Sequence, residues 1–489
     1  MSNLKNKIVS SLSWNFMSQG VTQVVSLLIM ILLTRLLSPR EFGLVAMVTA
    51  ISGFVGIFAE MGLGAALIHQ QKIDDEQLSS VFWLNLFLGV VLTAVFVLAA
   101  PLVADFYNEP LLLGITIVVA LNFIINALTI VQRILATKAL DFQTLAISEV
   151  ASTLISGGIV LFLAYQGYSY WSIVWQTLII SVVSNIILWQ RSTWRPRFCF
   201  SFASIRGLMR FGGYVIGTHT LDYWTRNIDN LLIGKFFGSE VLGLYSRAYS
   251  FLVFRINSVS RIVSRVFFPA IAGIQHDKER VKKIFLKTIG AIALVTFPLT
   301  VGLFATADNF VLTLLGARWM EMVPIVRALC LLGLTTAAGS LTANIFLSQG
   351  ESGLHFRLGL ILKMTVVAGI VLGLRWGAFG VALCYGLVTL VNVYPTIRIA
   401  GRLIGMGFNE YLKTLAPAFT CSLIMAGPVW ILPKLIFTDN AVWLILITQI
   451  LLGGVLYVGT LHLFRIKIYL EILELMQVKL YGKSTHIKC

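Results

Sequence analysis

The sequence predicts an all-α polytopic membrane protein with about 14 transmembrane helices. Of its 489 residues, 58% are hydrophobic and only 12% are charged. Apolar runs of about 20 residues, each long enough to cross a bilayer as a helix, recur along the whole chain. These observations argue against a water-soluble fold and predict that the chain crosses a membrane many times.

The first six predicted spans fill the N-terminal part of the chain. Pro and Gly mark the short turns between them, as at Ser38-Pro39 and Gly167, because these residues interrupt helices. The first apolar run is too long for a signal peptide, so we predict that it is a retained helix. The six spans lie near residues 12–37, 42–67, 79–104, 111–133, 146–166 and 168–190.

Eight further spans follow a basic connection at residues 191–210, which divides the chain into comparable halves. They lie near residues 211–236, 241–270, 284–307, 323–347, 355–376, 378–400, 415–435 and 440–464. We therefore predict four parts: an N-terminal six-helix half at 1–205, a C-terminal six-helix half at 206–405, two additional helices at 406–465 and a basic cytoplasmic tail at 466–489. The tail is amphipathic, which favours a position on the inner leaflet.

The two halves align when one is displaced by 200 residues. Arg35 then aligns with Lys235, and Gly43-Leu44 aligns with Gly243-Leu244. In each half these residues lie around the connection between the first and the second span. Because six spans separate the copies, a duplication would relate the halves by an axis along the membrane normal. This arrangement is typical of carriers that work by alternating access.

Positive charge predicts the orientation of the spans, since Lys and Arg accumulate in cytoplasmic connections. With the N-terminus inside, cytoplasmic segments hold about 24 Lys and Arg residues and outer connections hold about six. We therefore predict that both termini are cytoplasmic.

Positively charged residues inside the predicted spans are the candidate substrate-binding residues. A charge at bilayer depth costs at least about 2.5–3.5 kcal/mol on insertion scales, so it normally faces a partner or a watery cavity. These residues are Arg226, Arg247, Arg255, Arg261, Arg265, Arg327 and Lys363.

Four of these residues lie on the eighth span and form one basic stripe. Helical geometry places Arg247, Arg255, Arg261 and Arg265 within an arc of roughly 120°, which suits a pathway for an anion. The alternative is that the three residues nearer the span ends extend their side chains to the headgroups. Arg255, nearest the middle of the span, is least compatible with that alternative.

Acidic residues in the spans are candidates for ion coupling. Asp222, Arg226 and Asp229 follow i, i+4, i+7 spacing on the seventh span, so all three share one helix face. Either they neutralise one another structurally, or Asp222 or Asp229 exchanges a proton during transport. Glu60 and Glu149 are weaker candidates.

Motifs for catalysis and for metal binding do not occur in the sequence. It contains no GxxxxGK[ST], HExxH or GxSxG motif, so we expect no catalytic residues, no metal site and no cofactor. The five cysteines are far apart and have no CxxC spacing, and of the six histidines only His219 lies well inside a span. The net charge of +16 is explained by the Lys and Arg residues that orient the spans in the membrane. We therefore expect no nucleic-acid partner.

Several strings resemble the polysaccharide transporter family, and most closely its colanic acid exporter branch, within the multidrug, oligosaccharidyl-lipid and polysaccharide exporter superfamily. They include Phe42-Gly43-Leu44, Glu60-Met61-Gly62, Trp83-Leu84-Asn85, Arg210-Phe211-Gly212, the run 229–238, Gly243-Leu244-Tyr245 with Ala248-Tyr249, Phe268-Pro269-Ala270 before Gln275, and Gly316 with Trp319. The resemblance implies a Wzx-like flippase in a bacterial cytoplasmic (inner) membrane, with an oligosaccharide linked to undecaprenyl diphosphate as its substrate. It also implies membrane lipids, a polysaccharide polymerase and chain-length machinery as partners.

Two other functions compete with the flippase. A multidrug or cation antiporter of the same superfamily would need a predominantly acidic cavity, which the basic stripe disfavours. A membrane polymerase or ligase of polysaccharide synthesis would need large outer loops, and the predicted outer connections are short.

Overall fold

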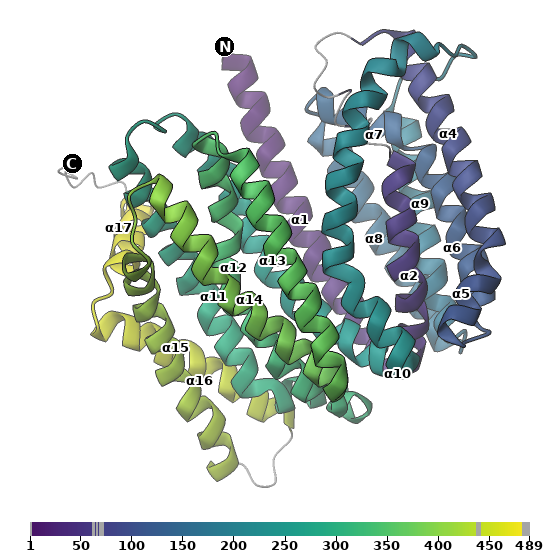
Figure 1. The fold of residues 1–489 in the computed structure, drawn as a ribbon. Helices are drawn as coiled ribbons and strands as arrows, with labels where there is room; N and C mark the ends of the chain where they lie inside the picture. The colour runs from purple at the N-terminus through teal and green to yellow at the C-terminus, as the bar shows by residue number, and fades with distance from the viewer. Residues whose placement is uncertain (1, 61–63, 65–66, 68–72, 437–441, 482–489) are drawn as a thin grey trace. The chain divides into compact units, whose positions relative to one another are not determined.

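A computed structural model of the chain describes residues 2–60, 64, 67, 73–436 and 442–481, and in those residues helices and turns are present without any β-strand. Figure 1 shows long helices joined by short connections. This confirms the predicted all-α class. Helices are favoured because each satisfies its own backbone hydrogen bonds, which a bilayer interior requires.

Candidate membrane spans are numerous, but their predicted number stays a prediction. Within the described residues, 9 helices are long and apolar enough to cross a membrane, or up to 10 if a bent pair counts as one span. Every predicted span nevertheless overlaps a helix. The chain is therefore a multi-pass membrane protein.

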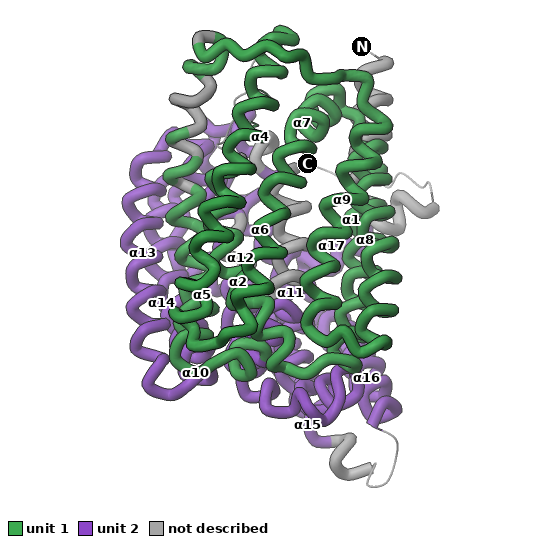
Figure 2. The backbone as a smooth tube through the Cα atoms, turned by 90° about the vertical axis from the view of Figure 1, so that its right-hand side faces the viewer, with its two compact units in different colours: residues 1–243 green, residues 244–489 purple. Residues whose placement is uncertain are grey.

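The chain divides into two compact units, coloured separately in Figure 2: Met1–Gly243 and Leu244–Cys489. In unit 1, α4 packs on α6, α6 on α9 and α8 on α9, and α1 packs on α8. Its helices are α1 (Ser2–Leu36), α2 (Pro39–Glu60), α4 (Asp75–Leu98), α5 (Ala100–Tyr107), α6 (Leu112–Ala127), α7 (Ile130–Lys138), α8 (Phe142–Tyr165), α9 (Tyr170–Arg191) and the first part of α10 (Phe202–Ala272).

Unit 2 repeats the first three of these contacts, with α11 on α12, α12 on α14 and α13 on α14. It adds α15 and α16, which both pack on α11. Its elements after α10 are α11 (Lys278–Leu314), η1 (Ala317–Met322), α12 (Val323–Ser348), α13 (Ser352–Gly373), η2 (Leu374–Trp376), α14 (Gly377–Leu403), α15 (Phe408–Ile436), α16 (Val442–Leu463) and α17 (Lys467–Tyr481).

The last two long helices are thus packing elements of unit 2. The hydroxyl of Tyr457 on α16 donates to the carbonyl of Leu294 on α11 at 2.9 Å. Buried residues of α11, α15 and α16 belong to one hydrophobic core, which includes Phe297, Met425 and Tyr457.

Helix α10 is two helices that meet at Gly238, whose φ of 82° interrupts the helical backbone. Glycine adopts this left-handed region without the steric cost that a Cβ imposes. The break lies 200 residues after Ser38, which separates α1 from α2. The displacement found in the sequence therefore also superimposes two breaks in helical structure.

Close backbone contacts beside these breaks are reciprocal. A Cβ on Gly43 would lie 1.6 Å from the carbonyl oxygen of Ser239, and a Cβ on Gly243 would lie 1.8 Å from the carbonyl oxygen of Pro39. The displacement of 200 residues exchanges the two contacts, as a two-fold axis does in a symmetric interface. This supports a duplication, although the boundary of the halves at 205/206 stays a prediction.

The fourth predicted span is bent, not straight. Helices α6 and α7 meet at 42° across residues 128–129. Two side chains of α9 bond the carbonyls at this break: Asn185 Nδ2 donates to Ile125 at 2.9 Å, and Trp189 Nε1 donates to Leu128 at 2.9 Å. Such partners allow a helix to break at membrane depth.

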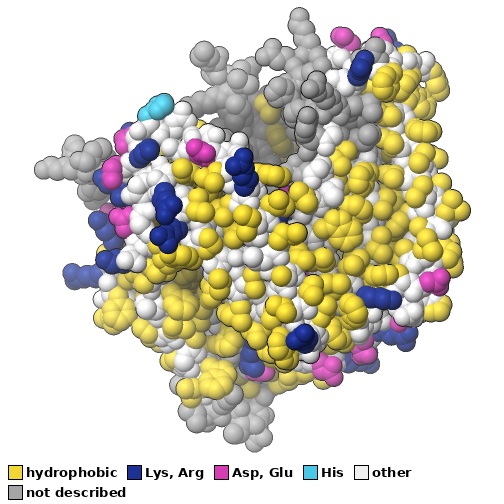
Figure 3. Space-filling model, in the orientation of Figure 1, with side chains coloured by type: hydrophobic (Ala, Val, Ile, Leu, Met, Phe, Trp, Pro, Cys, Tyr) yellow, Lys and Arg dark blue, Asp and Glu magenta, His cyan; other side chains and the backbone are white. Residues whose placement is uncertain are grey.

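The outward surfaces of the units are apolar. Large hydrophobic side chains such as Leu98, Val391 and Val455 are more than two-thirds exposed, at 79%, 69% and 71%. Hydrophobic side chains cover much of the face shown in Figure 3. In water a surface of this kind would aggregate, whereas lipid chains solvate it.

Candidate functional site

The structure assigns the candidate residues to two different units. Glu60, Asp222, Arg226 and Asp229 belong to unit 1, and Arg247, Arg255, Arg261, Arg265, Arg327 and Lys363 belong to unit 2. All ten lie on helices. The side chains of Glu60, Arg255, Arg261 and Arg265 lie outside those that the structure describes, so the basic stripe stays a prediction.

The acidic candidates of α10 lie beside an aromatic contact between α10 and α2. The hydroxyl of Tyr223 donates to the carbonyl of Ala50 at 2.8 Å. The ring of Phe54 packs against Trp224 at a centroid distance of 4.9 Å. Gly53 makes room for this contact, because a Cβ there would come 2.4 Å from the Tyr223 hydroxyl oxygen. The helix that carries Asp222 is therefore held tightly in unit 1.

The three charged residues of the i, i+4, i+7 group differ in burial. Asp229 is only 1% exposed, and its Oδ1 accepts from the backbone N–H of Asn230 at 2.8 Å. Asp222 is half-buried and Arg226 is exposed. Since a buried carboxylate is costly unless hydrogen bonds or ion pairs satisfy it, Asp229 is the member of the group that most depends on its protein partners.

Arg327 has a carboxylate partner that the sequence did not indicate. Its guanidinium donates to Asp308 Oδ2 on α11 at 2.5 Å and lies 5.8 Å from the centroid of the Phe304 ring. Both side chains are partly exposed, at 31% for Arg327 and 45% for Asp308. The pair lowers the cost of a charge in a membrane protein, so a structural role explains Arg327 as well as substrate binding does.

The other two described cations, Arg247 and Lys363, are half-buried. Lys363 lies on α13 next to a polar contact between α13 and α14, in which Asn392 Nδ2 donates to the Thr365 hydroxyl at 3.0 Å and to the Leu362 carbonyl at 3.2 Å. These hydrogen bonds tie α13 to α14 within unit 2, and Lys363 lies on a different side of α13 from Thr365.

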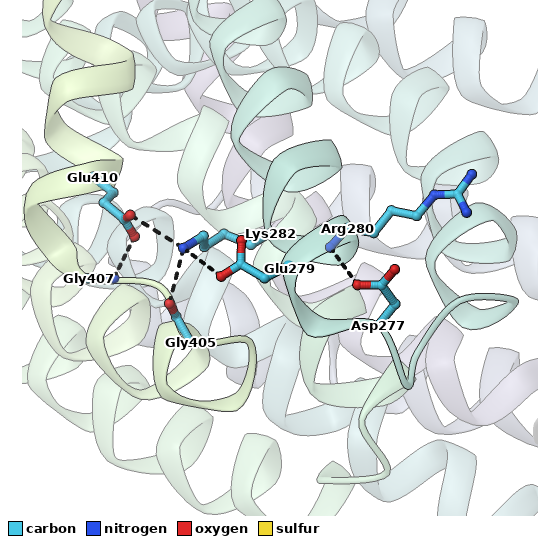
Figure 4. Close-up of polar contacts among 7 residues, drawn as sticks. All are labelled: Asp277, Glu279, Arg280, Lys282, Gly405, Gly407 and Glu410. Carbon is cyan, nitrogen blue, oxygen red and sulfur yellow. Dashed lines mark hydrogen bonds and ion pairs between the residues drawn. The ribbon is translucent and has the colours of Figure 1, made fainter. Parts of the chain in front are cut away.

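Basic residues at the start of α11 are partly engaged in tying unit 2 together, as Figure 4 shows. Lys282 Nζ lies 3.3 Å from Glu279 and 3.4 Å from Glu410, and it donates to the Gly405 carbonyl at 3.4 Å. Further along α11, Lys287 pairs with Glu471 of α17 at 2.5 Å. These contacts hold the α14–α15 connection and α17 against α11. The two lysines therefore stabilise unit 2 in addition to favouring a cytoplasmic position.

One buried polar contact also escaped the sequence analysis. Asn309 on α11 donates to the side-chain oxygen of Gln449 on α16 at 2.9 Å, and Gln449 donates to the Val429 carbonyl on α15 at 2.9 Å. Only the pairing of distant helices reveals it. No group of three His, Cys, Asp or Glu in the described part of the chain could hold a metal ion.

The fold is that of a known class of membrane transporters. The lipid II flippase MurJ in its inward closed conformation aligns with a TM-score of 0.76 over 93% of this chain and 98% of that chain, at 15% identity. An inward-facing multidrug resistance MATE family transporter of the MOP superfamily aligns with a TM-score of 0.60 over 78% of this chain and 94% of that chain, at 16% identity.

The chain belongs to the polysaccharide biosynthesis protein family, whose pattern matches residues 32–324. It is 27% identical to the teichuronic acid biosynthesis protein TuaB of Bacillus subtilis (strain 168), over 87% of this chain and 89% of that protein. It is 25% identical to the lipopolysaccharide biosynthesis protein WzxC of Escherichia coli (strain K12), over 86% of each. The resemblance found in the sequence is thereby confirmed.

Proposed function

We propose that this protein is a flippase that moves a lipid-linked oligosaccharide across the bacterial cytoplasmic membrane for the synthesis of a surface polysaccharide. One combination of observations carries the proposal: a chain of the polysaccharide biosynthesis protein family has the fold of a lipid II flippase along almost its whole length. Both termini would be cytoplasmic, and the protein would perform transport without catalysis.

The substrate headgroup would be undecaprenyl diphosphate, because two phosphates suit a cationic pathway. Arg255 and Arg226 would hold the diphosphate, with Arg247, Arg261, Arg265, Arg327 and Lys363 along its route. The two halves would then rock to expose the site to the other side. A polysaccharide polymerase and chain-length machinery would take over the product.

A multidrug or cation antiporter is the second candidate, since a multidrug transporter shares the fold. The family match and the positively charged residues inside the predicted spans favour the anionic substrate. A polymerase or ligase has less support, because the connections between described helices are short.

Deletion of the gene tests the proposed function directly. A flippase defect should leave the lipid-linked oligosaccharide on the cytoplasmic leaflet, because synthesis continues while transport stops. Inverted membrane vesicles, in which that leaflet faces outward, would show the accumulated sugar by lectin binding, and plasmid-borne protein should remove it. Loss of polysaccharide without such accumulation, or chain lengthening by the purified protein, would reject the flippase.

Ion coupling through α10 makes a second prediction. Asp222→Asn or Asp229→Asn should abolish the dependence of transport on pH, because an amide cannot exchange a proton in this range. Transport into proteoliposomes would be measured with and without an imposed pH gradient. Asp277→Asn is the matched control, since Asp277 caps the start of α11 by accepting from the N–H of Arg280 at 3.0 Å. Unchanged pH dependence in both variants would exclude these carboxylates.

A further inference from the structure

Three phenylalanines point outward where the chain passes from α9 to α10. Phe198 is 95% exposed, Phe200 is 55% exposed and Phe202 is 56% exposed. Single exposed apolar residues are common on protein surfaces, but several together mark a surface that contacts something apolar. All three belong to unit 1.

Hydrogen bonds to α4 hold this connection in place. The backbone N–H of Arg197 donates to the Ser79 hydroxyl at 3.1 Å, and that of Ser201 donates to the Ser80 hydroxyl at 2.9 Å. Trp83 Nε1 donates to the Arg197 carbonyl at 2.8 Å. Because Ser79 and Ser80 are completely buried, the connection is docked on the unit, and the exposure of its phenylalanines belongs to a defined structure.

Phe198 is the central residue of a tight turn in the connection. The backbone N–H of Cys199 donates to the Arg197 carbonyl at 2.9 Å, which closes a three-residue turn around Phe198. Arg197 itself pairs with Asp75 at 3.2 Å, and Arg195 donates to the Ser192 carbonyl at 2.6 Å. The Arg197 side chain is still 72% exposed, and the Phe198 ring stacks on Trp83 of α4 at a centroid distance of 5.1 Å while most of its surface stays exposed.

The connection lies at the depth of a membrane surface. Helix α9 has 22 residues, which at 1.5 Å per residue gives about 33 Å, enough to cross a hydrocarbon layer of about 30 Å. The chain therefore leaves the bilayer at Arg191. It then crosses α4 at Ser79 and Ser80, near the beginning of another candidate span. Side chains at this level meet headgroups and the first carbons of the acyl chains.

Positive charge flanks the phenylalanines. Arg191 and Arg206 are both exposed, and neither forms a salt bridge with a described carboxylate. Guanidinium groups at this depth attract anionic phospholipid headgroups, and Phe side chains of interfacial segments bury their rings at the boundary between headgroups and acyl chains. An anionic phospholipid can make both interactions, one through its headgroup and the other through its acyl chains.

We propose that Phe198, Phe200 and Phe202, with Arg191 and Arg206, form an interfacial anchor that inserts into the adjacent lipid leaflet and binds anionic phospholipid headgroups. The anchor fixes the connection between the two six-helix halves to the membrane surface. It does not depend on the transported substrate, so it stands apart from the proposed flippase function.

Fluorescence quenching tests the anchor on the full-length protein. In a variant whose five cysteines are replaced by serine, Phe198→Cys, Phe200→Cys and Phe202→Cys would each be labelled with bimane and reconstituted into vesicles of phosphatidylcholine and phosphatidylglycerol. Gln143→Cys is the matched control, because Gln143 is exposed beside the α7–α8 connection. Lipid with a doxyl group near the headgroup should quench the three anchor positions at least about twofold more than the control.

Three results would overturn the proposal. Quenching of all anchor positions by aqueous iodide to the same degree as position 143 would mean that the phenylalanines lie in water. Protection from both iodide and doxyl lipid would mean that protein covers the surface. Lipid quenching at position 198 that does not rise with the phosphatidylglycerol fraction, or that rises equally in the Arg191→Gln/Arg206→Gln variant, would exclude binding of anionic headgroups.

Discussion

Arg255→Ala is expected to remove most or all polysaccharide export while leaving the amount of protein in the membrane unchanged. Arg255 is the predicted span cation nearest the middle of its helix, where extension to the headgroups explains it least. A charged hydrogen bond contributes about 1.5–3 kcal/mol, so losing it from the bound diphosphate should weaken transport by about 10-fold to 150-fold. Surface polysaccharide in a complemented deletion strain provides the measurement.

Two further substitutions make this result specific. Arg255→Lys keeps the charge and should retain part of the export, because an ammonium still attracts phosphate but cannot bind it in two parallel hydrogen bonds. Arg280→Ala should have no effect, since Arg280 is an exposed residue in the first turn of α11. Full export by Arg255→Ala would remove this residue from the proposed route.

Gly243→Ala is expected to destabilise the protein and to reduce export. Its Cβ would lie 1.8 Å from the Pro39 carbonyl oxygen, and a backbone atom cannot move aside as a flexible side chain can. Overpacking of this kind typically costs about 1–3 kcal/mol. A lower melting temperature of the purified protein in detergent would record the loss.

The reciprocal contact allows a sharper test of this prediction. Gly43→Ala should produce a loss of similar size, because its Cβ would lie 1.6 Å from the Ser239 carbonyl oxygen. Gly217→Ala is the control, since nothing lies within 4 Å of a Cβ at that position of α10. A melting temperature of Gly243→Ala equal to that of Gly217→Ala would contradict the close crossing.

Much of the fold could be predicted because the bilayer restricts the choice of structure so strongly. An apolar run of about 20 residues can satisfy its backbone in lipid as a helix, and this rule predicted helices along the whole chain. It could not predict the bend at residues 128–129, because the side chains that bond the freed carbonyls come from α9, about 60 residues later. The break in α10 at Gly238 was predicted, because the sequence ends one span near residue 236 and begins the next near residue 241.

The candidate site was less predictable than the fold. A charge in an apolar run is visible in the sequence, so Arg327 was found, but its partner Asp308 lies on the neighbouring helix and was not. Likewise, i, i+4, i+7 spacing placed Asp222, Arg226 and Asp229 on one face without showing that only Asp229 is fully buried. Spacing fixes direction around a helix, whereas burial depends on what packs against it.

By itself, the sequence determined that this protein is an all-helical membrane protein, because hydrophobic run length and local turn chemistry act within one segment of the chain. Its family followed from strings of residues that resemble other members. Only the tertiary structure decided that α15 and α16 pack on α11, that Lys282 and Lys287 tie distant segments to that helix, and that Gly43 and Gly243 sit in reciprocal backbone contacts. These features arise between residues far apart in the chain, and such contacts form only after helices pack.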